Sequence, residues 1–499
     1  MTITELQQQY AVHPNVTAMN RLLKDVSVKH IFCGGLCASS ASLFFSVLVR
    51  KETCPFVFIL SDLEEAGYFY HDLTQVLGGE RILFFPSSFR RAIKYEQKDA
   101  ANEILRTEVL SRLQKGEKGL CVVTYPDALA EKVVSRKELS DKTLKLGVGE
   151  RVDSTFVTDV LHSYGFEYVD YVYEPGQYAV RGSIIDVFSF SSEYPYRIDF
   201  FGDEVESIRT FEVDSQLSRE KKDSIVIVPD LAVTGMASTS FLDFIPRDAV
   251  LAMRDFLWLR ERIQSVHDEA LTPQAIAVQE AEENGGITLE GKLIDGSEFT
   301  VHALDFRRLE FGNKPTGTAD ATVSFDVTAQ PIFHKNFDLA AASFQEYQEK
   351  GYSLYICSDS TKQTDRIRAI FEDRGDKISF IAVERTLHEG FADNELRLCV
   401  FTDHQLFDRF HKYNLKSDKA RSGKVALSLK ELNQFTPGDY VVHTDHGVGR
   451  FSGLVRIPNG DTTQEVMKLV YQNDDVVFVS IHSLHKVSKY KGKEGEPPR

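Results

Sequence analysis

Residues 30–50, HIFCGGLCASSASLFFSVLVR, combine a short apolar run, a turn of small residues and a second apolar run. The run up to Gly35 predicts a buried strand, and the residues after Ser39 predict a helix. The alternation continues through short apolar runs at 55–62, 81–86 and 119–125 and an amphipathic helical stripe within 97–116. Because strands that alternate with helices form parallel sheets, the first third of the chain predicts a parallel α/β domain.

The turn between this strand and helix partly matches the phosphate-loop template, which is Gly, four residues, Gly, Lys and Ser or Thr. Counting from Gly35 puts Ser40, Ala41 and Ser42 at the last three positions. Ala41 supplies no charge for the phosphates, and Ser40 adds a Cβ where the backbone would approach them closely. The nearest acidic segment, 60–67, has the pattern of a helix start rather than of a magnesium site. We therefore expect a degenerate, non-functional loop, with no nucleotide hydrolysis and no cofactor or metal in this segment.

The composition predicts a cytoplasmic protein of several domains. The 499 residues exceed one ordinary core, and 42 % hydrophobic with 26 % charged residues is typical of an ordered globular chain. We expect no membrane helix and no secretory signal, because no apolar stretch is long enough and the start lacks a basic and an apolar region. The six cysteines lie in apolar runs, as free thiols do in a reducing compartment. The net charge of −16 argues against a continuous DNA-coating face, although segment 411–424 is either an exposed linker or a basic DNA contact.

From about residue 143 the pattern changes to the period of two that is typical of antiparallel strands, clearest in residues 173–216. The Gly-Asp pair at 202–203 predicts a hairpin. Alternation sends two sets of side chains to opposite faces: Tyr196, Ile198 and Phe200 toward a core, and Arg197, Asp199 and Phe201 away from it, where Arg181 can join them. This mixed face is either a protein-binding surface or an Arg–Asp surface pair with Phe201 covered by another part of the chain.

The last part of the chain contains a second small α/β unit at 351–403 and a run of short strands at 435–490 that predicts a small antiparallel barrel. We expect the barrel's histidines to be structural rather than metal ligands, because no cysteine accompanies them and residues three apart on a strand face opposite ways: His443, His446, His482 and His485. Alternation places Phe451, Gly453, Val455 and Ile457 on one face. Ile457, just before the turn at 458–460, is either exposed for a partner or closes the barrel.

Three segments carry a resemblance to a known family: EPGQYAVRGSIIDVF (174–188), YPYRIDFFGDEVESIRTFEVDSQ (194–216) and GDYVVHTDHGVGRFSGL (438–454). In this order they are similar to segments of the N-terminal half of the bacterial transcription-repair coupling factors (Mfd). The resemblance covers nearly the whole chain. It includes the domain shared with the excision-repair protein UvrB and the Tudor-like RNA-polymerase-interacting domain shared with CarD-type regulators.

The resemblance implies binding partners and their contact residues. UvrA contacts would fall on Arg181, Arg197 and Phe201, and contacts with the RNA polymerase β subunit on Ile457, Arg456 and Leu454. A degenerate loop at Gly35, Ser40, Ala41 and Ser42 is also a family feature. No aromatic-rich insertion like that of UvrB follows residues 84–89, so the module would recruit repair proteins without verifying lesions.

The family's ATP-driven double-stranded DNA translocase lies C-terminal to the polymerase-binding domain, and the resemblance implies that this chain is a fragment that ends before it. ATP, Mg²⁺ and most DNA contacts would belong to that motor. The implied fold is multidomain α/β with a degenerate P-loop-like domain, a small α+β domain, a second small α/β domain and a C-terminal Tudor/SH3-like barrel. The implied domains are a UvrB-like α/β module at 1–142 and 223–333, a UvrA-binding domain at 143–222, a small α/β domain at 334–410, a linker at 411–430 and a polymerase-interacting domain at 431–499.

Three functions remain open from the sequence. The first is an adaptor that binds RNA polymerase stalled at lesions and recruits UvrA. The second is a polymerase-binding transcription regulator with an inert UvrB-like scaffold. The third is a divergent nucleotide-dependent DNA-repair enzyme that uses the loop at 35–42.

Overall fold

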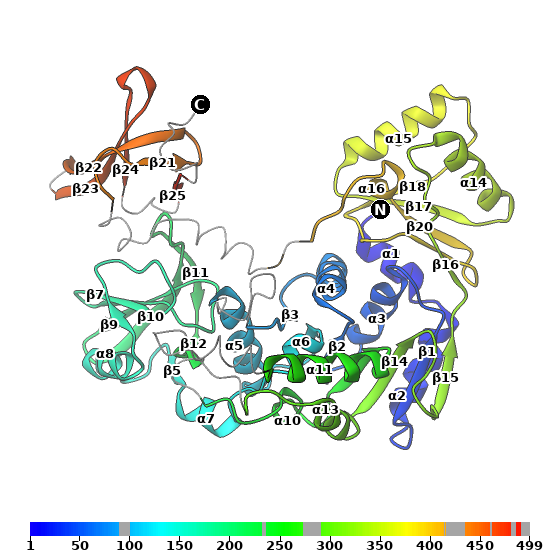
Figure 1. Cartoon of the computed structure of the whole chain (residues 1–499), viewed down its shortest axis with the longest axis horizontal. Coiled ribbons are helices and arrows are strands. Elements are labelled where there is room, and N and C mark those ends of the chain that lie inside the picture. The colour runs from blue at the N-terminus through cyan, green and yellow to red at the C-terminus, as the bar shows by residue number, and fades with distance from the viewer. Residues whose placement is uncertain are drawn as a thin grey trace. The chain divides into compact units, whose positions relative to one another are not determined.

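The computed structural model describes residues 1–88, 100–231, 236–272, 291–413, 415, 435–459, 462–480 and 486–490 (Figure 1). The chain forms two compact units. The first unit combines residues 1–138 with 236–415, and the second combines 139–235 with 416–499. The chain therefore leaves the first unit and returns to it before the C-terminal segment.

A seven-stranded sheet forms the centre of the first unit, in the order β15-β1-β14-β13-β2-β4-β3. Its strands are β1 (His30–Gly34), β2 (Phe56–Ile59), β3 (Ile82–Phe84), β4 (Cys121–Thr124), β13 (Val250–Arg254), β14 (Arg307–Gly312) and β15 (Ala321–Ser324). Every neighbouring pair is parallel, which confirms the predicted parallel α/β sheet. Three of the seven strands come from the chain after residue 236, so the sheet closes only when the chain returns from the second unit.

Helices accompany this sheet: α1 (Ile3–Tyr10), α2 (Pro14–Lys24), α3 (Ser40–Arg50), α4 (Leu63–Leu77), α5 (Ala100–Gln114), α6 (Pro126–Leu129), α10 (Phe241–Phe244), α11 (Phe256–Ala270) and α13 (Gly296–Ala303). Helix α7 (Arg136–Asp141) spans the boundary in the chain between the two units. Helix α3 is buried from Ser40 to Val49 and contacts α1, α2 and α4. Its small, uncharged first turn is what allows burial on every side. Asp62 caps α4 by accepting from the Glu65 N–H at 2.8 Å, so the predicted helix start at 60–67 is confirmed.

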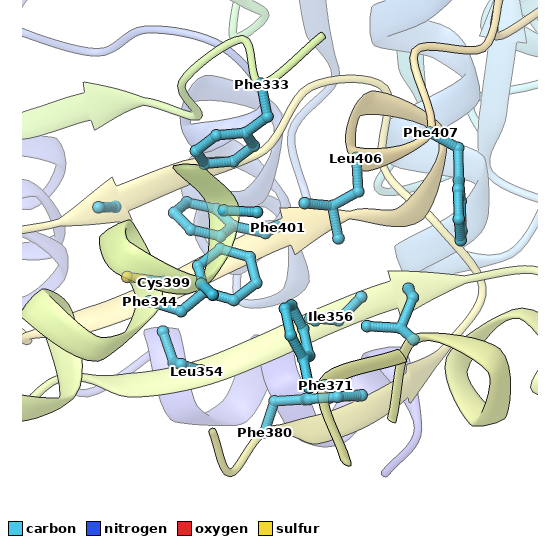
Figure 2. Close-up of a cluster of buried hydrophobic side chains, with 14 residues drawn as sticks. Phe333, Phe344, Leu354, Ile356, Phe371, Phe380, Cys399, Phe401, Leu406 and Phe407 are labelled. Carbon is cyan, nitrogen blue, oxygen red and sulfur yellow. The ribbon is translucent and has the colours of Figure 1, made fainter. Parts of the chain in front are cut away.

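A second, five-stranded sheet in the first unit has the order β16-β19-β20-β17-β18. Its elements are β16 (Val327–Ala329), β17 (Ser353–Ser358), β18 (Ile381–Glu384), β19 (Phe391–Asp393), β20 (Leu398–Thr402), α14 (Phe337–Glu349), α15 (Thr361–Asp373) and α16 (Asp403–Leu406). Figure 2 shows its aromatic core, in which the Phe344 ring lies 5.7 Å from that of Phe371 and 5.4 Å from that of Phe401. Residues 351–403 thus contain the strands and helix that the sequence predicts there.

The segment 139–235 of the second unit contains a six-stranded sheet in the order β11-β10-β9-β8-β7-β6. Its strands are β6 (Glu167–Tyr168), β7 (Gln177–Arg181), β8 (Ile184–Val187), β9 (Tyr196–Phe201), β10 (Glu204–Phe211) and β11 (Ser218–Lys222), beside a two-stranded sheet of β5 (Leu144–Gly147) and β12 (Ser224–Ile227). Helix α8 (Ser154–Ser163) packs Val157 and Leu161 against one face of the sheet, where Ile198 and Phe200 lie. The hairpin at 202–203 and the core side of β9 agree with the prediction.

The C-terminal segment forms a five-stranded antiparallel sheet in the order β24-β23-β22-β21-β25. The strands are β21 (Tyr440–His443), β22 (Gly447–Asn459), β23 (Thr462–Val470), β24 (Val476–Ser480) and β25 (Val487–Lys489), with a 3₁₀ turn, η2 (Gln472–Asp474). Val441, Phe451, Met467, Leu469, Val479 and Val487 form its core. The predicted antiparallel strands are confirmed; across the described residues, the edge strands β24 and β25 do not pair to close a barrel.

The prediction that Phe451 and Ile457 share one face is wrong. Phe451 pairs with Leu469, whereas Ile457 pairs with Gln464 after a bulge between Phe451 and Leu454. The extra residue in the bulge reverses the alternation, and Gly453 at φ +103° permits this backbone. Ile457 therefore lies on the face opposite to Phe451.

Candidate functional sites

The degenerate loop lies between β1 and α3, so the predicted strand-to-helix turn is confirmed. Gly35 has φ +88°, and a Cβ at this position would lie 2.0 Å from the Phe325 carbonyl oxygen. The loop backbone is therefore packed tightly against the end of β15. The Ser40 hydroxyl donates to the Cys37 carbonyl at 2.5 Å, so this side chain bonds to its own loop.

A segment after β18 covers the start of α3. The Ser39 N–H donates to the Glu389 carbonyl at 3.1 Å, and the Ser39 hydroxyl accepts from the Glu389 N–H at 2.9 Å. The Ser42 hydroxyl donates to Asp72 Oδ2 at 2.8 Å, and Asp72 Oδ1 accepts from the His388 N–H at 2.8 Å. The groups that would receive a phosphate and its metal ion are thus bonded to the protein itself.

The remaining cleft beside the loop, of about 310 Å³, is acidic. Its lining includes five carboxyl groups: Asp62, Glu64, Glu65, Asp72 and Glu389. Arg254 is the one arginine in that lining, and its Nε lies 3.3 Å from Glu65 Oε1. Burial raises the pKa of Asp72, although hydrogen bonds from Ser39 and Ser42 oppose the shift. Because carboxylates repel phosphate oxygens, this cleft is electrostatically unfavourable for a polyphosphate.

Two of the predicted contact residues, Arg181 and Arg197, converge on one carboxyl group, Asp186 of β8. Arg197 Nε lies 2.8 Å from Asp186 Oδ1 and its Nη2 lies 3.1 Å from Oδ2, a bidentate pair. Arg181 Nη2 donates to Asp186 Oδ2. Arg197 also donates to the Gln216 carbonyl at 2.9 Å and lies over the Phe211 ring. We call Arg181, Asp186 and Arg197 the arginine cluster.

The side chains of this cluster differ in the fraction of their surface that is exposed. The Asp186 side chain is 1 % exposed, that of Arg197 17 % and that of Arg181 37 %. Arg181 therefore presents most of the accessible positive charge, and Arg197 is largely a structural group. The sequence-based interpretation did not identify Asp186. The pattern that could have revealed it is a single acidic residue inside the largely apolar run SIIDVF, residues 183–188.

Phe201 lies at the end of β9, next to the turn, and is 76 % exposed. The alternative that another part of the chain covers Phe201 is therefore wrong for the described residues. Asp199 does not pair with Arg197, because its Oδ1 accepts from the Ser183 hydroxyl at 2.8 Å. By strand alternation Phe201 shares the face of Arg197, so an exposed aromatic ring and an accessible arginine occupy one sheet face.

The three residues predicted to contact RNA polymerase lie on β22 beyond the bulge. Leu454 is 36 % exposed and Arg456 is exposed, whereas Ile457 is half-buried. Leu454 and Arg456 share one face of the strand, and Ile457 lies on the other. Strand β21 pairs with β22 as far as Arg450, and the Phe451 backbone still bonds to Asp439 and Gly438, so in the described residues 452–459 pair along one edge, with β23. This part of β22 therefore offers side chains on both faces of the strand. It also offers a backbone edge that has no strand partner among the described residues.

The barrel histidines are only partly described. His443 Nδ1 accepts from the Asp445 N–H at 3.1 Å, a local turn contact, and its ring lies 4.7 Å from that of His446. His482 and His485 lie outside the described residues, as does most of the basic segment 411–424. Within the parts that the structure describes, no helix has the length and apolar character needed to cross a membrane.

Comparison with known proteins finds two domains of known families in this chain. A family model described as the UvrB interaction domain matches residues 144–232, and one described as the CarD-like/TRCF RID domain matches residues 435–491. A protein that contains both domains joins a UvrB-type segment to a segment of the CarD type.

Curated relatives match nearly the whole chain. A transcription-repair-coupling factor of Bacillus subtilis (strain 168) is 23 % identical over 551 residues, covering 95 % of this chain and 46 % of the relative. That of Staphylococcus aureus (strain bovine RF122 / ET3-1) is 22 % identical over 542 residues, covering 93 % of this chain and 45 % of the relative. The resemblance is confirmed: the chain is related to the transcription-repair-coupling factors over nearly its whole length. It spans about half the length of the curated relatives it matches.

Proposed function

We propose that this chain acts as an adaptor in transcription-coupled repair. One domain binds UvrA and another binds RNA polymerase through its β subunit, so that a stalled polymerase recruits the excision-repair machinery. The observation that carries the proposal is the presence in one chain of matches to a UvrB interaction domain at 144–232 and a CarD-like/TRCF RID domain at 435–491.

The sheet face beside the arginine cluster is the proposed UvrA-binding surface. Phe201 and Arg181 are the direct contacts, because both are exposed and because aromatic rings and arginines contribute much of the energy at protein interfaces. Arg197 is a positioning residue: its bidentate pair with Asp186 keeps that carboxylate in place beside Arg181. Substitution of Phe201 or Arg181 would therefore remove a direct contact with UvrA, whereas substitution of Arg197 would act through the position of Asp186.

The UvrA contact is tested by binding of purified UvrA to the full chain and its variants. We expect Phe201→Ala and Arg181→Ala each to weaken binding by about tenfold or more while the fold is retained. Phe156→Ala is the matched control, since Phe156 is also exposed but lies on α8, which packs on the other face of the same sheet. Wild-type affinity in both test variants would remove this surface from the proposal.

The polymerase contact is proposed at Leu454, Arg456 and Ile457, together with the unpaired edge of β22. Binding of purified RNA polymerase from the same organism tests it. We expect Leu454→Arg and Ile457→Arg to weaken binding by about tenfold or more, because each places a charge in an apolar contact. Val12→Arg is the control, since Val12 is an exposed apolar residue in the first unit. Polymerase binding without any UvrA binding would favour a transcription regulator instead of an adaptor.

The absence of nucleotide hydrolysis in this segment is part of the proposal. It is supported by the acidic cleft beside Ala41 and by the commitment of Ser39 and Ser42 to Glu389 and Asp72. ATP-dependent activity would then reside outside this segment. DNA contact would likewise depend mainly on residues outside it.

A further inference from the structure

Three histidines far apart in the sequence meet in the first unit. His388 follows β18, His404 lies in α16 and His411 follows that helix. One nitrogen from each lies within 4.8 Å of the others. We call these three residues the histidine cluster.

The geometry inside the cluster is close. Nδ1 of His388 lies 3.1 Å from Nδ1 of His411. The rings of His404 and His411 stack with centroids 4.3 Å apart. The ring of His71, on α4, lies 4.8 Å from that of His411. Four imidazoles therefore occupy one small region, of which three form the tight group.

The surrounding protein holds these rings in place. The Tyr68 ring stacks on His388 with centroids 3.4 Å apart, and its hydroxyl donates to the His411 carbonyl at 2.6 Å. The segment that contains His411 also packs closely on α4, because a Cβ at Gly67 would lie 2.4 Å from the Tyr413 ring. The positions of the imidazoles are thus set by α4 as well as by the backbone of their own segment.

One nitrogen of the cluster is buried without a hydrogen bond. His404 Nε2 lies 2.6 Å from the His388 carbonyl oxygen, and only a protonated nitrogen can donate to a carbonyl. In the neutral ring with its proton on Nε2, Nδ1 carries the lone pair. Among the described residues this Nδ1 is buried and has no hydrogen-bond partner, and Asp403 Oδ1 lies 3.7 Å away. A lone pair in this state is suited to a metal ion.

We propose that His388, His404 and His411 bind one divalent transition-metal ion, with Zn²⁺ as the best match. Two nitrogens at tetrahedral positions about 2.0–2.1 Å from Zn²⁺ are about 3.3 Å apart. The distance between Nδ1 of His388 and Nδ1 of His411 is 3.1 Å, which is close to this value. The rings of His404 and His411 are stacked, so His404 turns out of this stack when all three nitrogens bind one ion, and the fourth position is left for water or His71. Imidazole nitrogens do not favour Mg²⁺ or Ca²⁺, which take oxygen ligands.

A metal ion here would connect the second sheet of this unit to the degenerate loop. His388 and Glu389 bond to Asp72 and Ser39, so fixing His388 to α16 and to residue 411 would hold this segment over the start of α3. The site would be structural rather than catalytic. It departs from the sequence-based expectation of no metal, which concerned the barrel histidines rather than these three.

The proposal is tested with Zn²⁺ and Co²⁺ alone on the full chain after chelator treatment. We expect one metal ion per chain, a rise in melting temperature with Zn²⁺, and a tetrahedral Co²⁺ spectrum without a thiolate charge-transfer band. His388→Gln and His411→Gln should each weaken binding by about 100-fold. His162→Gln is the matched control, because it removes an exposed histidine from α8 in the second unit.

Two results would overturn the proposal. One is the lack of stoichiometric binding by the wild-type chain at micromolar metal. The other is unchanged binding in the His388→Gln/His411→Gln double variant, which would mean adventitious binding elsewhere. Circular dichroism of the metal-free variants checks that each is folded; if the His388 variant is not, His411→Gln alone decides the question.

Discussion

Arg197 binds Asp186 through two nitrogens, Nε at 2.8 Å and Nη2 at 3.1 Å, and the carboxyl group between the strands is almost completely buried. Arg181 approaches the same carboxyl group from β7. A buried anion with two arginines around it ties three strands together on the face where Phe201 is exposed. The rigid part of the proposed UvrA surface is thus an ion pair, and its accessible part is an aromatic ring with an arginine.

Asp186→Asn should destabilise the domain at 139–235. The substitution leaves two arginines beside a neutral amide, and breaking a buried ion pair costs on the order of 3 kcal/mol. Faster hydrogen exchange in β7 to β10 would report the loss. Asp199→Asn is the control, because Asp199 bonds to Ser183 on a more exposed part of the face and should cost less than about 1 kcal/mol. Equal effects of the two substitutions would contradict the structural role of Asp186.

Gly35→Ala should destabilise the first unit by more than about 2 kcal/mol. The new methyl group would meet the Phe325 carbonyl oxygen at 2.0 Å in addition to the strain of φ +88°. Gly78→Ala separates the two causes, because Gly78 has φ +81° but nothing within 4 Å of its Cβ position. The midpoint of urea unfolding measures both variants. If Gly78→Ala is as damaging as Gly35→Ala, close packing of the loop is not the reason.

Glu131 predicts a pH dependence with a definite sign. Burial raises its pKa from 4.5 to about 7, although Arg106 Nη1 lies 3.2 Å from Glu131 Oε2 and opposes the shift. The folded chain therefore holds this proton more strongly than the unfolded chain. Its stabilising contribution is present below about pH 4.5 and is lost as the pH rises through about 7.

Unfolding midpoints of wild type and Glu131→Gln across this pH range test the prediction. The stability difference, wild type minus variant, should fall as the pH rises, and other titrating groups cancel in the difference. A difference that grows with pH would mean that the Arg106 charge outweighs the burial of the carboxyl group.

The chain should not bind ATP with Mg²⁺ at millimolar concentration. The cleft beside Ala41 presents carboxylates to the phosphates, and Ser39 and Ser42 are already hydrogen-bonded. Equilibrium dialysis with labelled ATP measures this directly. Adding a charge by Ala41→Lys should not create binding, because residue 41 is buried in α3 and a lysine there would disturb the packing. Saturable ATP binding by the wild-type chain would instead support a nucleotide-dependent enzyme.

Local pattern was sufficient for several elements. The alternation around Gly35 predicted the strand-to-helix turn, and the Gly-Asp pair at 202–203 predicted the hairpin between β9 and β10. It also predicted that Ile198 and Phe200 face a core. These features depend on residues within a few positions of one another, so periodicity and turn chemistry are enough to find them.

The same reasoning was wrong at Ile457 because a single bulged residue reverses the two faces of a strand, and alternation cannot reveal it. It also missed Asp186, whose importance depends on arginines from two other strands. In both cases the deciding contact is with a neighbouring strand.

The sequence by itself determined that this chain builds parallel α/β and antiparallel β segments and that its loop lacks the phosphate-binding lysine. Only the tertiary structure decided that Glu389 would cover Ser39, that Asp186 would hold two arginines, and that His388, His404 and His411 would meet. The physical reason is the sequence separation of the interacting residues. Periodicity reports neighbours along the chain, whereas burial, ion pairing and metal ligation depend on residues that the fold brings together across as many as 383 positions.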